Sequence, residues 1–176
     1  TGVIFSSIVP CTIELKITPV NLQSLIEEEI DSAYPIAIAK NIQLESKIDS
    51  NVSITMGDSG RLQQVFANLL SNAIKFTPES GNIKVCLKQV KNTAQIIVSD
   101  TGKGISSELL PHIFERFRQG KDIESKQKGL GLGLAIARHL VKLHNGTIKA
   151  ESPGKEKGTT FVVSLPLYCE QLTVNS

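Results

Sequence analysis

The sequence lacks any run of about 18 apolar residues, the length that a helix needs to span a bilayer. It also lacks a strong net charge, because 19 basic residues face 17 acidic ones and leave a formal charge of +2. This balance gives no reason to expect nucleic acid or an anionic membrane surface as a partner. Residues 1–10 are apolar in character but lack the basic front of a signal peptide. We therefore expect a domain without nucleic-acid or membrane contact.

Cysteine is scarce and irregularly placed. Cys11, Cys86 and Cys169 are odd in number and share no CxxC spacing, so neither a disulfide scaffold nor a zinc site is indicated. A reducing, cytoplasmic setting fits this pattern, whether or not the parent protein is anchored in a membrane. Internal repeats and low-complexity blocks are also absent from the sequence. With 176 residues and 40% hydrophobic content, the chain is large enough for one well-buried domain.

Apolar periodicity predicts a mixture of helices and antiparallel hairpins. The expected elements are a strand over 13–16 ended by Pro19, a helix over 19–40 kinked or interrupted by Pro35, a strand over 42–48, a helix over 61–75 capped by Asp58 or Ser59, hairpin strands over 83–88 and 95–100, a short helix over 106–112, a helix over 130–144, and strands over 147–151 and 159–166. The polar segment 118–128 has no apolar period and is expected to be a mobile loop. This order predicts an α+β sandwich with helices on one face of the sheet.

Three polar residues share one face of the helix expected over 61–75. At about 100° per residue, Asn68, Asn72 and Lys75 fall within roughly 60° of one another. Such a stripe is often only a solvated face, and the stripe alone leaves that alternative open. Asparagine is a mediocre helix former, however, so two of them in a helix interior indicate a demand for their amides. An amide oxygen can ligate Mg²⁺, and a lysine can meet phosphate.

Two glycine clusters follow along the chain. Asp100 ends an apolar strand and precedes Gly102 and Gly104, which would let the backbone approach a flat ligand at which the carboxylate points. A carboxylate accepts from an exocyclic amine, which favours adenine over guanine. Segment 129–133 (GLGLG) begins a helix, where N–H groups attract phosphate. Each cluster also has an ordinary structural explanation, a common turn in the first case and close helix packing in the second.

Taken in order, these motifs resemble those of sensor histidine kinases. Segment 68–76 (NLLSNAIKF) is similar to the N box, 100–104 (DTGKG) to the first glycine box, 114–117 (FERF) to the F box, 129–133 to the second glycine box, and 158–161 (GTTF) to the final glycine motif. The resemblance covers about residues 12–167, with 1–18 as linker and first strand and 168–176 as a tail. It implies the Bergerat ATP-binding fold of gyrase, the heat-shock chaperone and mismatch-repair ATPases, a two-layer α/β sandwich with a mixed, mostly antiparallel sheet.

The resemblance also implies a role for each matching residue. Asn72 would ligate Mg²⁺, while Asn68, Lys75 and Arg116 would act as catalytic residues near the phosphates of ATP. Asp100 would bind the adenine amine, Gly102 and Gly104 would shape the base pocket, and Thr159 would assist there. The phosphates would meet Gly129, Leu130, Gly131, Leu132 and Gly133, with Arg116 and Arg118 as further contacts, and Phe114 and Phe117 would anchor a lid. Leu130 stands where threonine is frequent in the family, and leucine offers no hydroxyl.

The phospho-accepting histidine of this family lies upstream, in a His-Glu or His-Asp context. His112, His139 and His144 lack that context and are expected to be structural or surface residues. The resemblance thus implies the catalytic domain of a two-component kinase, which transfers the γ-phosphoryl of Mg-ATP to a histidine on a separate dimerisation hairpin. A response-regulator receiver domain would be a further partner.

Two alternatives remain beside the kinase. The first is an ATP-hydrolysing switch of the same fold, in which a glutamate stands four residues before the metal-ligating asparagine. Here that place holds Asn68, whose amide cannot take a proton from water, so the kinase is favoured. The second is a non-catalytic nucleotide-binding or interaction module. It would require a damaged site, yet every motif is present.

Overall fold

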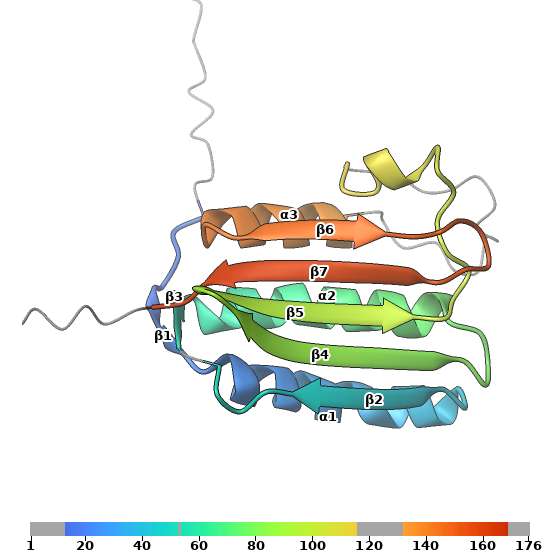
Figure 1. The fold of residues 1–176 in the computed structure, drawn as a ribbon, viewed down its shortest axis with the longest axis horizontal. Helices are drawn as coiled ribbons and strands as arrows, with labels where there is room; N and C mark the ends of the chain where they lie inside the picture. Colours follow the sequence, from blue (N-terminus) through green and yellow to red (C-terminus); the bar gives the residue numbers. More distant parts are fainter. Residues whose placement is uncertain (1–12, 53, 116–131, 169–176) are drawn as a thin grey trace, which may run out of the picture.

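The computed structural model describes residues 13–52, 54–115 and 132–168. In these ranges a five-stranded sheet is covered on one face by three helices (Figure 1). The strand order is β2-β4-β5-β7-β6, in which β2 and β4 run parallel and the other neighbours run antiparallel. The α+β, two-layer sandwich with a mixed, mostly antiparallel sheet is therefore confirmed.

The elements follow the expected order along the chain. The helices are α1 (Leu22–Ala39), α2 (Ser59–Phe76) and α3 (Gly133–Leu143), with a 3-10 turn, η1, at Leu110–His112. The strands are β1 (Thr18–Val20), β2 (Gln43–Ile48), β3 (Thr55–Gly57), β4 (Asn82–Val90), β5 (Thr93–Asp100), β6 (Thr147–Glu151) and β7 (Thr159–Pro166). The expected mobile loop over 118–128 lies outside the described residues. None of the helices in the described ranges is both long and apolar enough to cross a membrane.

The first strand differs from the prediction. The strand expected over 13–16 and ended by Pro19 is wrong, because β1 begins at Thr18 and includes Pro19. Pro19 pairs with Met56 of β3 in a separate two-stranded antiparallel sheet, and a proline is tolerated on such an edge. Sequence reasoning missed β3 because three residues are too few to show alternation.

Two helix predictions also need correction. Pro35 does not interrupt α1, which continues to Ala39. Pro35 lies on the exposed side of that helix, where water can bond the carbonyl that a proline leaves without a donor. The helix expected over 106–112 is only the 3-10 turn over 110–112, preceded by a turn over 107–109. Pro111 lies inside this short segment and has no N–H for a longer helical ladder.

The helical layer packs through an apolar stripe on α2. The stripe residues expected from the sequence are all buried: Leu62, Val65, Phe66, Leu69, Leu70 and Ala73. They face the inward side chains of the central strands, which include Ile83, Val85, Leu87, Ile96, Val98 and Val163. Burying each such side chain contributes about 1.5–3 kcal/mol relative to exposure, so this layer fixes where α2 lies. The opposite side of α2 is therefore held in a defined orientation.

The N-terminal end of α2 is anchored by its capping residue, Asp58, and by His144, which follows α3. Asp58 is the N-cap, as expected, and its Oδ1 accepts from the Arg61 N–H at 3.1 Å. Its Oδ2 accepts from the Lys16 N–H at 2.9 Å, and these backbone bonds hold the pKa of Asp58 below its ordinary value. His144 is buried, and its Nε2 accepts from the Asp58 N–H at 2.9 Å. Its Nδ1 therefore carries the hydrogen that it donates to the Leu140 carbonyl at 2.8 Å.

The C-terminal end of α2 is capped by an ammonium group. Lys40 Nζ donates to the carbonyls of Ile74, Lys75 and Thr77, at 2.7, 3.1 and 2.6 Å. A positive charge is favourable at this end of a helix, where carbonyl oxygens lack intrahelical partners. The carbonyl of Phe76, between these residues, accepts instead from the Lys103 N–H of the first glycine loop.

Candidate nucleotide-binding site

The polar stripe on α2 faces the beginning of α3. Asn68, Asn72 and Lys75 are each half-buried rather than fully solvated. The Asn68 side-chain Nδ2 donates to the Gly133 carbonyl at 3.2 Å. A Cβ placed on Gly133 would lie 3.4 Å from Asn68 Oδ1, so a side chain there would crowd the amide. A merely solvated face is therefore wrong for Asn68, because its amide joins two helices.

The second glycine cluster does begin a helix, but later than expected. α3 begins at Gly133 with Leu132 as its N-cap residue, and no side chain caps this end. The Ile136 N–H bonds the Leu132 carbonyl at 2.9 Å, so the N–H groups before Ile136 have no intrahelical acceptor. These donors and the helix dipole make this end suited to an anion. Gly129, Leu130 and Gly131 lie outside the described residues.

The other two stripe residues differ in their surroundings. Lys75 Nζ lies 5.1 Å from the centroid of the Phe76 ring, a cation–π contact that holds the ammonium near the end of α2. No hydrogen bond between described residues uses the Asn72 amide. Its oxygen is thus available to a hard cation such as Mg²⁺, which commonly takes one or two protein oxygens and fills its shell with water and phosphate. In the described ranges, no cluster of His, Cys, Asp and Glu could hold a metal by itself.

Asp100 lies at the end of β5, directly opposite Thr159 at the start of β7. Its Oδ1 accepts from the Gly102 N–H at 2.8 Å and from the Thr159 N–H at 3.3 Å. Its Oδ2 accepts from no described residue, which leaves one oxygen for a ligand. Burial raises the pKa of Asp100 above its ordinary value, although the two N–H bonds oppose this shift. Thr159 is buried, and its contribution to Asp100 comes from its main chain.

The first glycine loop packs closely against the end of α2. A Cβ on Gly102 would lie 2.5 Å from the Phe76 carbonyl oxygen, which excludes any side chain at this position. The next N–H, of Lys103, donates to the same oxygen at 3.1 Å. Gly104 has a φ of +62°, in the left-handed region that favours glycine. The structure therefore explains these glycines by chain packing, and their role in shaping a base pocket stays a prediction.

Phe114 is fixed to the body of the domain. Its ring meets Phe161 of β7 edge-on, with 6.3 Å between centroids and 78° between planes. The guanidinium of Arg138, on α3, lies 5.7 Å from the Phe114 centroid. Sequence reasoning missed Arg138, although its place on the exposed side of the helix after the glycine cluster could have drawn attention to it. The other F-box residues predicted to act here, Arg116 and Phe117, and the following Arg118 lie outside the described residues.

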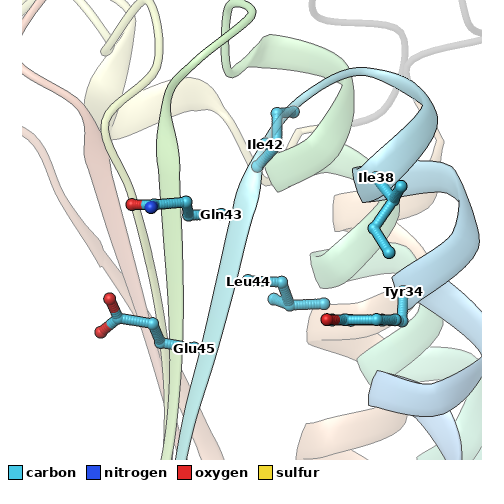
Figure 2. A pocket seen from close by; sticks show the side chains of 6 residues that line it. All are labelled: Tyr34, Ile38, Ile42, Gln43, Leu44 and Glu45. Atoms are coloured by element: carbon cyan, nitrogen blue, oxygen red, sulfur yellow. The ribbon is translucent and has the colours of Figure 1, made fainter.

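Two surface grooves are lined by none of the predicted site residues. One lies between α1 and β2, where Leu44 points toward Tyr34 while Gln43 and Glu45 point away from the helix (Figure 2). The other is lined by residues of the β1–β3 end, among them Ile17, Met56 and Tyr168. Neither groove is lined by Asn68, Asn72, Lys75, Asp100 or Gly133.

Comparison with protein families decides which ATP-binding fold this is. Residues 57–168, more than half of the chain, match the family described as histidine kinase-, DNA gyrase B-, and HSP90-like ATPase. The chain belongs to this ATPase family. Hybrid signal transduction histidine kinase D of Dictyostelium discoideum is 38% identical over 181 residues, covering 84% of the chain and 12% of that protein. Sensor histidine kinase RppB of Synechocystis is 36% identical over 148 residues, covering 84% of the chain and 32% of that protein.

Solved structures place this ATPase-family domain among histidine kinase catalytic domains. Full-length ShkA in complex with AMPPNP has a TM-score of 0.76 and 30% identity, covering 88% of this chain and 32% of that one. The catalytic domain of ThkA has a TM-score of 0.75 and 30% identity, covering 86% of this chain and 97% of that one. ThkA in complex with the response regulator TrrA has a TM-score of 0.73 and 29% identity, covering 88% of this chain and 42% of that one. The domain thus has the fold of an ATP-binding kinase catalytic domain, and it spans under half the length of the full relatives named here.

Proposed function

We propose that this domain binds Mg-ATP and transfers its γ-phosphoryl to a histidine on a separate dimerisation hairpin of a sensor histidine kinase. The observation that supports this most directly is the contact between Asn68 and Gly133. It joins the polar stripe of α2 to a helix N-terminus whose first N–H groups have no intrahelical acceptor, which is where a triphosphate would bind. Asp100, at the end of β5, would hold the base at the other end of the nucleotide.

Adenine recognition would depend on Asp100. Its Oδ1 is committed to two main-chain N–H groups, which fixes the plane of the carboxylate. Oδ2 would then accept from the exocyclic amine of adenine, whereas guanine presents an oxygen there and would repel it. Gly102, Gly104 and Thr159 would line the base pocket, because the loop and strand end that carry them are bonded to the same carboxylate.

The phosphates would lie between α2 and the start of α3. Asn72 would hold Mg²⁺ through its amide oxygen, and the ion, when bound, would neutralise charge on the phosphate oxygens. Lys75 would add a positive charge, while Leu132, Gly133 and the preceding Gly129, Leu130 and Gly131 would offer main-chain N–H groups. Arg116 and Arg118 are proposed as further phosphate contacts. Phe114 and Phe117 are proposed to anchor a lid, formed by the segment that leads from Phe117 to α3.

Catalysis by this domain would consist of positioning and charge stabilisation. The nucleophile would be an imidazole nitrogen of the acceptor, so no base on this chain needs to activate water. Asn68 agrees with this, because its amide takes no proton and its Nδ2 is engaged by the Gly133 carbonyl. The ATP-hydrolysing switch, which needs a glutamate at that place, is therefore disfavoured.

The partners follow from the reaction. The domain would act on a dimerisation hairpin of the parent kinase, in the cytoplasm, and the phosphoryl group would pass to a receiver domain of a response regulator. The relative ThkA is known in complex with the response regulator TrrA, which supports the second step.

Titration with ATP in the presence and absence of Mg²⁺ tests the binding step. We expect tight binding with the metal and weak binding without it, and Asn72→Ala should remove most of that difference. Ser71→Ala is a matched control, since Ser71 is exposed and, among the described residues, its hydroxyl bonds only the Asn68 carbonyl of its own helix. Equal affinities with and without Mg²⁺ would reject Asn72 as the metal ligand.

A further inference from the structure

The hydroxyl of Ser152, directly after β6, lies between two loops that pack on each other. Its Oγ accepts from the Ile105 N–H at 2.9 Å and donates to the Gly158 carbonyl at 2.7 Å. The Gly154 carbonyl and N–H also lie near it, at 3.3 and 3.4 Å. One hydroxyl thus connects the segment after Asp100 with both ends of the β6–β7 loop.

Main-chain hydrogen bonds join the same two loops. The Gly158 N–H donates to the Gly102 carbonyl at 3.0 Å, and the Glu156 N–H donates to the Lys103 carbonyl at 2.6 Å. Gly154 and Gly158 have φ values of +134° and +75°, which favour glycine. A Cβ on Gly158 would collide with the Asp100 carbonyl oxygen, so the loops meet backbone to backbone. The Ser152 side chain adds bonds to both loops beside these main-chain contacts.

The contact matters for Asp100 because its carboxylate is held from both loops. One bond to Oδ1 comes from Gly102, in the first loop, and the other from Thr159, which follows the second. The Thr159 bond is 3.3 Å long, so a small separation of the loops would break it and let the carboxylate rotate. Without the hydroxyl, the Ile105 N–H and the Gly158 carbonyl would lose their partner, which favours such a separation.

We propose that Ser152 is a positioning residue for base selection: its hydroxyl holds the two loops together and so aims the Asp100 carboxylate at the exocyclic amine of adenine. This inference rests on the proposed ATP-binding function. Ser152 does not touch the nucleotide in this scheme. It contributes through the orientation of Asp100, so its loss should affect recognition of the base more than recognition of the phosphates.

The experiment compares ATP with inosine triphosphate, which carries an oxygen in place of the amine. Affinities are measured for the wild type, Ser152→Ala, Ser152→Thr and the control Ser99→Ala. Ser99 also bonds across β5 and β7, to the Thr160 hydroxyl at 3.0 Å, but its side chain makes no hydrogen bond to either loop in the described residues. We expect the wild type to prefer ATP, Ser152→Ala to lose about tenfold of that preference, and Ser152→Thr and Ser99→Ala to retain it. A purely structural role would lower the melting temperature and leave the preference unchanged.

Each outcome has a separate meaning. A wild type that prefers ATP, together with a Ser152→Ala variant of equal preference, would overturn the positioning role and leave the proposed function intact. A wild type that binds neither nucleotide would overturn the proposed function and this inference with it. If Ser152→Ala does not fold, Ser152→Cys carries the test, because a thiol donates and accepts weakly. The preference of Ser152→Cys for ATP over inosine triphosphate should then be weaker than that of Ser152→Thr and stronger than that of an Asp100→Asn variant. A preference equal to that of the wild type would contradict the proposal.

Discussion

The Asn68 amide bonds the Gly133 carbonyl, 65 residues later in the chain, at 3.2 Å. This contact joins the α2 motif to the start of α3, so two sequence motifs become parts of one site. The same amide stands where a hydrolase of this fold would need a proton acceptor.

Asn68→Asp should reduce phosphoryl transfer more than it reduces stability. The new carboxylate would face the Gly133 carbonyl oxygen and lose the donor, which would shift the start of α3. We expect a loss of about 1–3 kcal/mol from this contact and a fall in transfer rate of at least about tenfold. Urea unfolding and a transfer assay measure the two effects. Transfer at the wild-type rate would show that the contact has no catalytic role.

Asp100→Asn should weaken ATP binding without unfolding the domain. Asparagine keeps Oδ1 as the acceptor for Gly102 and Thr159 but places an NH₂ group where Oδ2 would meet the adenine amine. Loss of a hydrogen bond to a charged group corresponds to about 10- to 100-fold in affinity. Calorimetric titration and thermal unfolding check the two parts, and undiminished affinity would remove Asp100 from the base pocket.

The affinity for ATP should depend on pH through Asp100. Burial raises its pKa, so the carboxylate is lost on acidification earlier than an exposed aspartate would be. The ratio of wild-type to Asp100→Asn affinity should therefore fall on acidification while the pH is still above 3.8, the ordinary pKa of an aspartate. Taking this ratio cancels the effect of titration of the nucleotide itself. The same shift predicts that ionisation of Asp100 lowers the free energy of unfolding as pH rises through its pKa. A ratio that does not change with pH would contradict this.

Lys40→Met should destabilise the domain. It removes the ammonium that donates to three carbonyls at the end of α2, and a methionine retains most of the aliphatic stem. We expect a loss of about 1–3 kcal/mol in the free energy of unfolding. Lys47→Met is the control, because Lys47 is exposed on β2 and should change stability by less than about 0.5 kcal/mol. If the two substitutions lowered the free energy of unfolding equally, Lys40 would not stabilise the domain as a cap of α2.

Much of the fold was predictable because it depends on local patterns. The hairpin of β4 and β5, the strands β6 and β7, and Asp58 as the N-cap of α2 agree with the sequence-based expectations. The strand β1 was misplaced and β3 was missed, since short strands leave no periodic signal and form through their pairing.

The site was predictable as a set of motifs, but not as a set of contacts. The sequence indicated Asn68, Asp100 and Gly133, whereas their connections depend on packing between distant segments. Lys40 and Ser152 were not anticipated, because a lysine at a helix end and a serine in a turn are common in any sequence. Their importance comes from tertiary hydrogen bonds that no local pattern encodes.

The most direct test of the kinase assignment follows the γ-phosphoryl group of Mg-ATP, with and without the dimerisation hairpin of the parent protein. The domain alone should bind ATP, release phosphate slowly and remain unlabelled. When the hairpin is added in trans, its histidine should become labelled, weakly, since tethering would normally supply a high effective concentration. Release of phosphate by the domain alone at about 1 per second or faster, with no label on the hairpin, would contradict the kinase assignment and favour the ATPase.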